Sequence, residues 1–469
     1  MDSTIKPRGI VVFSGGSAAN NLVDVFKSVR ENKKCPLSYV IPISDNGGSS
    51  SELIRVFGGP GIGDVRSRLV RLIPSDPDHD DSEKSAIKTF FNHRLPKDRV
   101  LAKQEWFAIV EAEHPLWEHI SSAKKELIRS FLNLVNFEIA KRKRPSSTFN
   151  FEAASIGNLF LTGARLFSGS FESAIYLLSS ICSVPSHTSV LPAINTNFTH
   201  HISAGLANGT IITGQNSISH PTTPSLPTQT LQPHEPPSTA TMNSQPTADD
   251  EPEDANPPGT HPTLRAPAIS FSKTTSALPA RINRIWYINP YGAEIRLTAN
   301  PRVISALLNA DAVVYSIGSL YTSIVPSLIL KGVGDALRDE KIRYKILILN
   351  AVNDRETGAG SDAPYSAMDF VGAVVKAANE SRGVEGGVGR EEWREYVTHI
   401  VHLVGEGTPV VEREELAGLG IECVRVYGRR VEGEEYVRYD ERALVQALEV
   451  VMGGVDPRLV KSRRNTLEN

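Results

Sequence analysis

The sequence predicts an α/β protein built on a doubly wound, mostly parallel sheet, in a Rossmann-like three-layer α/β/α arrangement. Short apolar, β-branched runs alternate with stretches of helical period along most of the chain. Several of these runs end abruptly in glycine- and hydroxyl-rich segments, which is typical of the ligand-binding edge of a parallel sheet. We predict a single domain over residues 1–453, interrupted by a helical insertion or lid at 75–150 and a disordered insertion at 220–278, with a flexible tail at 454–469.

The first expected unit is a strand, a glycine loop and a helix. Residues 9–13 are apolar and mostly β-branched, and Gly15, Gly16 and Ser17 follow them before helical spacing begins at Leu22. A glycine loop in this position presents a helix amino terminus to a phosphate group. The loop lacks both the Gly-Lys-Ser/Thr of a P-loop and the third glycine of the dinucleotide fingerprint. It therefore favours a mononucleotide or a diphosphate over a full dinucleotide.

The strand expected over residues 37–43 runs into a strongly polar loop. Glycines in such a loop let backbone N–H groups approach an anion, and its serines would bind phosphate oxygens. Its aspartate would hold a ribose hydroxyl or a metal ion. The same residues also form ordinary turns, so the loop alone leaves a simple surface turn open. The loop comprises Asp45, Asn46, Gly47, Gly48, Ser49 and Ser50.

A second glycine-rich stretch, which includes Gly63, precedes a helix through residues 69–73. Asp64 is either the N-cap of that helix or a functional carboxylate. Arg66 lies in the first turn, where a cation opposes the helix dipole, so we expect it to have an anionic partner.

Composition changes sharply at residues 220–278, where Pro, Thr, Ser and Gln dominate. Such a segment cannot bury enough apolar surface to offset its ordering entropy, so we expect disorder. Strand-like runs at 201–206 and 210–213 precede it, joined by an Asn208-Gly209 hairpin turn, and another follows at 282–288. We interpret the segment as a loop inserted into one domain, with a linker between two domains as the alternative.

The second half of the chain repeats the alternation. The strand expected at 312–317 ends in a second hydroxyl-rich loop where a helix begins, and the strand at 345–349 ends at Asn350. The hydroxyls of that loop would hold a phosphate group or cap the helix without a ligand. The residues concerned are Gly318, Ser319, Tyr321, Thr322 and Ser323.

Composition excludes several classes of partner. The formal net charge of −3 provides no general attraction to nucleic acid or an anionic membrane. No apolar run reaches the ~18 residues that a membrane helix needs, and the amino terminus lacks a signal pattern. The three cysteines match no zinc spacing, and we interpret them as reduced thiols. We therefore expect a cytoplasmic protein without nucleic-acid or membrane partners, and a homodimer is compatible with the sequence.

Together, these motifs resemble the CofD/YvcK family, which includes 2-phospho-L-lactate transferases and bacterial gluconeogenesis factors that bind sugar nucleotides. The resemblance implies a nucleotide held by Gly15, Gly16, Ser17 and the 318–323 loop. It also implies that Asp45 and Asp64 are catalytic and bind Mg²⁺. One departure is Asn46, which stands where relatives commonly have a second aspartate. The matching blocks are Ser14-Gly15-Gly16-Ser17, Ser44-Asp45-Asn46-Gly47-Gly48-Ser49-Ser50, Gly61-Ile62-Gly63-Asp64-Val65-Arg66, Ser155-Ile156-Gly157-Asn158-Leu159, Gly318-Ser319-Leu320-Tyr321-Thr322-Ser323 and Asn350.

Two functions follow from the resemblance. The first is transfer of a phospho-group from a nucleoside-diphosphate-activated donor, which needs positioning and electrostatics but no dedicated nucleophile. The second is a non-catalytic sensor of a nucleotide sugar such as a UDP-sugar, which the loss of an acid at Asn46 favours. A scaffold that binds nothing tightly is the third alternative.

Overall fold

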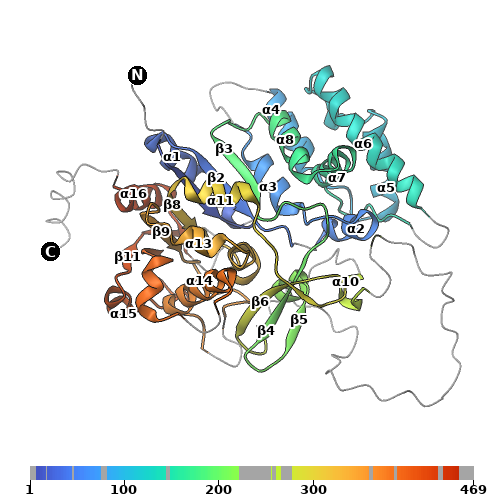
Figure 1. Cartoon of the computed structure of the whole chain (residues 1–469). Coiled ribbons are helices and arrows are strands. Elements are labelled where there is room, and N and C mark those ends of the chain that lie inside the picture. The colour runs from blue at the N-terminus through green and yellow to red at the C-terminus, as the bar shows by residue number, and fades with distance from the viewer. Residues whose placement is uncertain are drawn as a thin grey trace, which may run out of the picture.

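The structure is a computed structural model of the whole chain (Figure 1). The predicted tail at 454–469 and most of the predicted insertion at 220–278 lie outside the residues that it describes. The described residues are 7–16, 18–44, 47–74, 82–143, 148–220, 255, 260–265, 277–358, 363–384, 388–430 and 437–453.

A seven-stranded parallel sheet forms the centre of the described chain, in the order β11-β10-β9-β8-β1-β2-β3. Its middle strands are buried on both faces, and Val12 and Val313 are fully inaccessible to solvent. Burial on both faces explains why these strands are continuous apolar runs. The strands are β1 (Gly9–Phe13), β2 (Leu37–Ile41), β3 (Thr188–Pro192), β8 (Ala310–Tyr315), β9 (Tyr344–Ile348), β10 (His399–His402) and β11 (Glu422–Arg425).

Strand order reverses between β1 and β8. From β1 the chain proceeds outward through β2 to β3, and from β8 it proceeds the opposite way through β9 and β10 to β11. Right-handed crossovers in opposite directions place their helices on opposite faces of the sheet. This is the doubly wound arrangement that the sequence predicts. It opens a crevice at the carboxyl ends of β1 and β8, where ligands bind in sheets of this type.

Helices cover both faces (Figure 1). On one face α1 packs against α16, and on the other α11 and α14 both pack against α13. The helices concerned are α1 (Val23–Lys33), α11 (Pro301–Leu308), α13 (Val333–Leu337), α14 (Ala367–Arg382) and α16 (Glu441–Val451).

The described part of the expected insertion at 75–150 is mainly helical. Its helices α4 and α6 pack on α7, and Trp106 of α5 is fully buried. Helix α6 ends at Arg142, so Lys141 and Arg142 lie in its last turn, where cations interact favourably with the helix dipole. These helices are α4 (Ser82–Asn92), α5 (Arg99–Val110), η2 (Pro115–Trp117) and α6 (Ser122–Arg142), followed by α7 (Ile156–Ser168) and α8 (Phe171–Ile181).

A second, antiparallel sheet has the order β5-β4-β6-β7. The sequence indicates its strands but not that they leave the main sheet. The Asn208-Gly209 hairpin is confirmed, with Gly209 at a φ of 85°. Strand β4 pairs with β6, so strands from both sides of the 221–276 segment lie side by side. The strands are β4 (His201–Leu206), β5 (Ile211–Thr213), β6 (Ile282–Ile288) and β7 (Glu294–Ile295).

A short part of the predicted insertion packs on the molecule. Residues Pro262–Arg265 form helix α10, in which Leu264 is buried. Ala255 donates its N–H to the carbonyl oxygen of Arg55.

The remaining elements are short, apart from two nine-residue helices, α2 and α3. None of the described helices is long and apolar enough to cross a bilayer. The remaining elements are η1 (Ala18–Leu22), α2 (Ser49–Phe57), α3 (Gly63–Arg71), α9 (Gln215–Ser219), the π-helix η4 (Leu320–Ile324), α12 (Val325–Leu328), η5 (Arg390–Glu395), α15 (Arg413–Gly418), β12 (Gly428–Arg430) and β13 (Val437–Tyr439).

Candidate functional site

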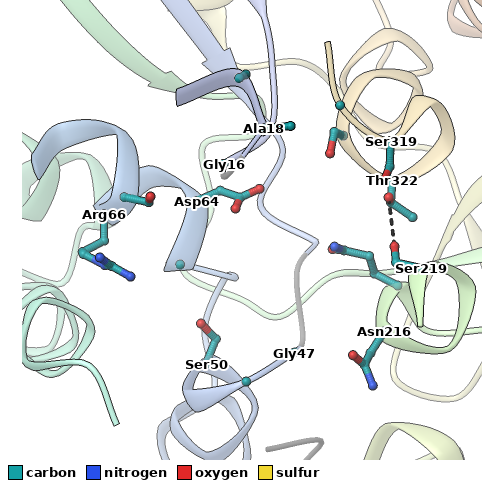
Figure 2. Close-up of a pocket in the computed structure, with 18 of the residues that line it drawn as sticks. Gly16, Ala18, Gly47, Ser50, Asp64, Arg66, Asn216, Ser219, Ser319 and Thr322 are labelled. Carbon is teal, nitrogen blue, oxygen red and sulfur yellow. Dashed lines mark hydrogen bonds between the residues drawn. The ribbon is translucent and has the colours of Figure 1, made fainter. Parts of the chain in front are cut away.

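A cavity of about 720 Å³ lies at the crevice between β1 and β8 (Figure 2). The loops that follow β1 and β8 form part of its wall, and the amino-terminal turns of α2, α3 and α7 form another part. Its size is in the range of small-molecule sites. The cavity brings together most of the predicted site residues: Gly15, Gly16, Gly47, Gly48, Ser49, Ser50, Gly63, Asp64, Arg66, Asn158, Gly318, Ser319, Thr322 and Ser323.

Two glycines allow the loop after β1 to lie against its neighbours. A Cβ on Gly16 would overlap the carboxylate of Asp64, and one on Gly15 would overlap the hydroxyl of Ser323. Glycine is therefore required at these two positions because neighbouring side chains approach the backbone closely. It is not required by backbone conformation, since neither φ angle lies in the left-handed region. The result is that an acid from α3 and a hydroxyl from η4 reach the same loop.

The structure corrects the alternative that Asp64 caps α3. The N-cap is Ile62, and Asp64 lies inside the first helical turn with its side chain toward Gly16. Helices α2 and α7 also begin at the cavity, and as in α3 their N-cap residues form no side-chain capping hydrogen bond. Three helix amino termini that lack side-chain caps give this wall a positive potential that suits an anion.

Arg68 of α3 holds the loop after β1 in place through hydrogen bonds to its backbone. This role of Arg68 was not predicted from the sequence. Its side chain is fully buried and donates to the carbonyl oxygens of Gly15 and Ala19, at 3.1 and 3.3 Å, and to the hydroxyl of Ser14 at 3.2 Å. The guanidinium also lies over the ring of Tyr39, 4.5 Å from its centroid. A signal was available, because Arg68 falls on the apolar stripe of α3 where a cation is unusual.

Arg66 and Asn158 form a polar network at one end of the cavity. The Nε of Arg66 donates to Oδ1 of Asn158 at 3.2 Å, and an Nη donates to Oδ1 of Asn92 at 3.2 Å. Asn158 in turn donates to the hydroxyls of Ser49 and Ser50. The pKa of Arg66 is lowered to about 10, mainly by burial and also by the nearby charge of Arg94, while the charge of Asp64 opposes the shift. Asn92 and Arg94 come from the helical insertion, and sequence reasoning missed both.

The loop after β8 is shaped by Gly318, which has a φ of 137°. Asn350 accepts the N–H of Gly318 and donates to its carbonyl oxygen, both at 2.9 Å. Asn350 thus holds the predicted phosphate loop, but its own side chain lines a neighbouring cavity.

Tyr321 does not reach the cavity, which corrects its predicted role in ligand binding. Its phenol is buried, lies 3.0 Å from the hydroxyl of Tyr365 and donates to the carbonyl oxygen of Ile282 at 3.2 Å. The wide turns of the π-helix η4 direct Thr322 and Ser323 to the cavity and Tyr321 to the core.

Glu356 forms hydrogen bonds with residues of both η4 and α9. No role was assigned to it from the sequence. Its buried carboxyl accepts the N–H of Tyr321 at 2.8 Å and the hydroxyl of Thr322 at 2.6 Å, and the hydroxyl of Ser219 lies 3.1 Å away. The pKa of Glu356 is raised to about 8, mainly by burial and also by the nearby charge of Asp354. The contact of Ser219 with Thr322 is visible in Figure 2. Through this anchor α9 adds four unpredicted residues to the cavity wall: Gln215, Asn216, Ser219 and His220.

A second cavity of about 900 Å³ adjoins the first. Both are lined by Ala18 and by residues 317–319, so the loops after β1 and β8 separate them. The lining of the second cavity carries mixed charge, with four arginines and three carboxylates. The arginines are Arg71, which is ion-paired with Asp24, and Arg429, Arg438 and Arg442; the carboxylates are Asp354, Asp440 and Glu441.

Three of the predicted site residues, Ser17, Asp45 and Asn46, lie outside the described residues. Asp64 is the sole carboxylate among the described residues that line the first cavity. The described chain contains no cluster of three His, Cys, Asp or Glu side chains that could hold a metal ion.

Comparisons with known proteins agree with this architecture. The chain is 43% identical over 410 residues to an uncharacterized protein of Saccharomyces cerevisiae, covering 84% of this chain and 90% of that one. It is 21% identical over 426 residues to the gluconeogenesis factor of Bacillus subtilis, covering 90% of each chain. A crystal structure of a UPF0052 family member from Bacillus halodurans shares the fold, with a TM-score of 0.55 at 19% identity over 94% of this chain and 99% of that one.

The family assignment rests on a match along almost the whole chain. The family model described as 2-phospho-L-lactate transferase CofD matches residues 10–450, a span that includes every predicted site residue. The chain therefore belongs to the CofD family.

Proposed function

We propose that the protein binds a nucleoside-diphosphate-activated donor across the two adjoining cavities and transfers its terminal phospho-group to an acceptor hydroxyl. The observation that carries the proposal is the convergence of Gly15, Gly16 and Gly318 with three uncapped helix amino termini at the switch point of the sheet. Backbone N–H groups and helix dipoles together favour a diphosphate. The description of the matching family model, 2-phospho-L-lactate transferase, supports the same chemistry.

The transfer is a displacement at phosphorus. The acceptor oxygen bonds to the terminal phosphorus of the donor, the bond from that phosphorus to the bridging oxygen breaks, and the acceptor hydroxyl releases its proton to water. The leaving group is a nucleoside monophosphate. Such a reaction depends on positioning and charge stabilisation. Asp64 is the carboxylate that stands where the loop after β1 meets α3.

Magnesium fits this arrangement. Mg²⁺ prefers oxygen ligands and is commonly held by one or two carboxylates plus substrate phosphates. Asp64 and the ligand phosphates meet that requirement, and Asp45, the other predicted ligand, lies outside the described residues. When bound, the ion would offset charge that develops on the bridging oxygen.

Calorimetric titration of the full chain with GDP, UDP and UDP-sugars, with and without Mg²⁺, tests the proposal. We expect micromolar or tighter binding of at least one nucleotide, strengthened by Mg²⁺. Asp64→Asn should remove the Mg²⁺ effect and leave the magnesium-free affinity within about twofold. Ser130→Ala, on the exposed side of α6, is the matched surface control. Absence of binding by all of these ligands would refute the proposal.

A nucleotide-sugar sensor is the second candidate. The scarcity of carboxylates in the described cavity wall favours it, as do the relatives that are named gluconeogenesis factors. Release of nucleoside monophosphate, followed by chromatography, separates the two functions. A bound UDP-sugar that is recovered unchanged, in the presence of candidate acceptors, supports the sensor.

A further inference from the structure

Two arginines share the end of the first cavity that lies away from the second cavity. Arg66 comes from the first turn of α3, and Arg94 follows helix α4 of the insertion. In Figure 2, Arg66 lies on one side of the cavity, Ser319 and Thr322 lie on the other, and Asp64 stands between them. The residues shared with the second cavity, 317–319, are thus on the far side from Arg66.

Neither arginine forms an ion pair with any described residue. Arg66 is only 7% exposed, and its hydrogen bonds go to the neutral amide oxygens of Asn92 and Asn158. Arg94 donates to the carbonyl oxygen of Ala153 at 3.3 Å. A buried guanidinium beside a second cation is costly unless an anion compensates it.

The surroundings increase the positive potential. The turns at the amino termini of α3 and α7 both reach this end of the cavity and lack side-chain caps. Arg66 is also built into the site, because its aliphatic stem packs on Gly157 of α7. A Cβ on that glycine would lie 2.8 Å from Cδ of Arg66. The guanidinium is thus fixed in place before any ligand arrives.

We propose that Arg66 and Arg94 form a second anion subsite, which holds a carboxylate or phosphate group of the acceptor. The inference rests on the proposed function, because it assigns the donor diphosphate to the glycine loops on the other side of Asp64. An acceptor that carries an anionic group in addition to its hydroxyl would be anchored by the two guanidinium groups. Its hydroxyl would then lie toward Asp64 and the donor.

The test uses the full chain saturated with whichever nucleotide binds best, and inorganic phosphate and malonate as probes. We expect one of the two anions to bind to the nucleotide complex. Arg94→Gln should weaken that binding at least tenfold and change nucleotide affinity less than twofold. Arg66→Gln should have a larger effect on the anion. The matched control is Arg99→Gln in α5, which lies outside the cavity. The better probe distinguishes a phosphate subsite from a carboxylate subsite.

The outcomes separate the two proposals. Arg94 is exposed, so its variant should fold even if Arg66→Gln does not, which thermal unfolding will show. If Arg94→Gln leaves anion binding unchanged, or weakens nucleotide binding as much as anion binding, there is no separate acceptor subsite. A further outcome is that no nucleotide binds, whereas phosphate or malonate binds to the free protein and this binding requires both arginines. That result would refute the proposed donor site and support the anion subsite.

Discussion

Replacing Glu356 by glutamine should abolish one component of the pH dependence of stability. Burial raises the pKa of this carboxyl to about 8 in the folded protein, from an ordinary value of 4.5. Between these values the unfolded chain has released the proton and the folded chain retains it, so raising the pH favours unfolding. One proton corresponds to about 1.4 kcal/mol per pH unit, or roughly 2.7 kcal/mol between pH 5.5 and 7.5. The loss should end as the pH passes the folded-state pKa.

Glutamine preserves the contacts of Glu356 while it removes the titrating proton. Its carbonyl oxygen can accept the N–H of Tyr321, and its amide can donate to the hydroxyls of Thr322 and Ser219. Urea unfolding of both proteins at pH 5.5, 6.5 and 7.5 measures the difference, in which the contributions of groups distant from Glu356 cancel. Glu126→Gln, on the exposed side of α6, is the control. Parallel pH profiles for wild type and Glu356→Gln would refute the reasoning.

Three further predictions concern the walls of the cavity. Arg68→Met leaves three hydrogen-bond acceptors without their donor. We therefore expect it to lower the free energy of unfolding by roughly 3 kcal/mol, measured in urea, and to weaken nucleotide binding. A loss under about 1 kcal/mol would contradict the supporting role of Arg68. Tyr321→Phe should cost about 1 kcal/mol and leave nucleotide affinity unchanged, whereas a fivefold loss of affinity would return Tyr321 to the site. Gly16→Ala should reduce nucleotide affinity at least tenfold, because its methyl group overlaps Asp64. The control Gly209→Ala has open space around its methyl group but a φ of 85°, so it should cost about 1 kcal/mol of stability without affecting nucleotide affinity. Equal nucleotide affinities in the two variants would show that space at Gly16 is not needed.

Short-range patterns were enough to predict the sheet and many of the residues that line the first cavity. Runs such as Gly9–Phe13 are apolar because they are buried on both faces, and the loops at their carboxyl ends meet wherever parallel strands are neighbours. The sequence could not show which way Tyr321 points, because a π-helix changes the direction of side chains without a periodicity of its own. Nor could it bring α9 to the cavity, since that depends on the contact between Ser219 and Glu356, which are 137 residues apart.

The distribution of charge along the two cavities follows from the topology of the sheet. Three arginines of the second cavity come from β12, β13 and α16 at the carboxyl end of the chain, whereas Arg71 of that cavity and the pair Arg66 and Arg94 come from the first half. Because strand order reverses between β1 and β8, elements from the two halves of the chain meet at this crevice from opposite sides. Asp64 stands between Arg66 and the loop after β8 (Figure 2). The second cavity also contains Asp354, Asp440 and Glu441, which offset its arginines. The end of the first cavity at Arg66 and Arg94 has no described carboxylate other than Asp64, so unbalanced positive charge is concentrated where we propose the acceptor subsite.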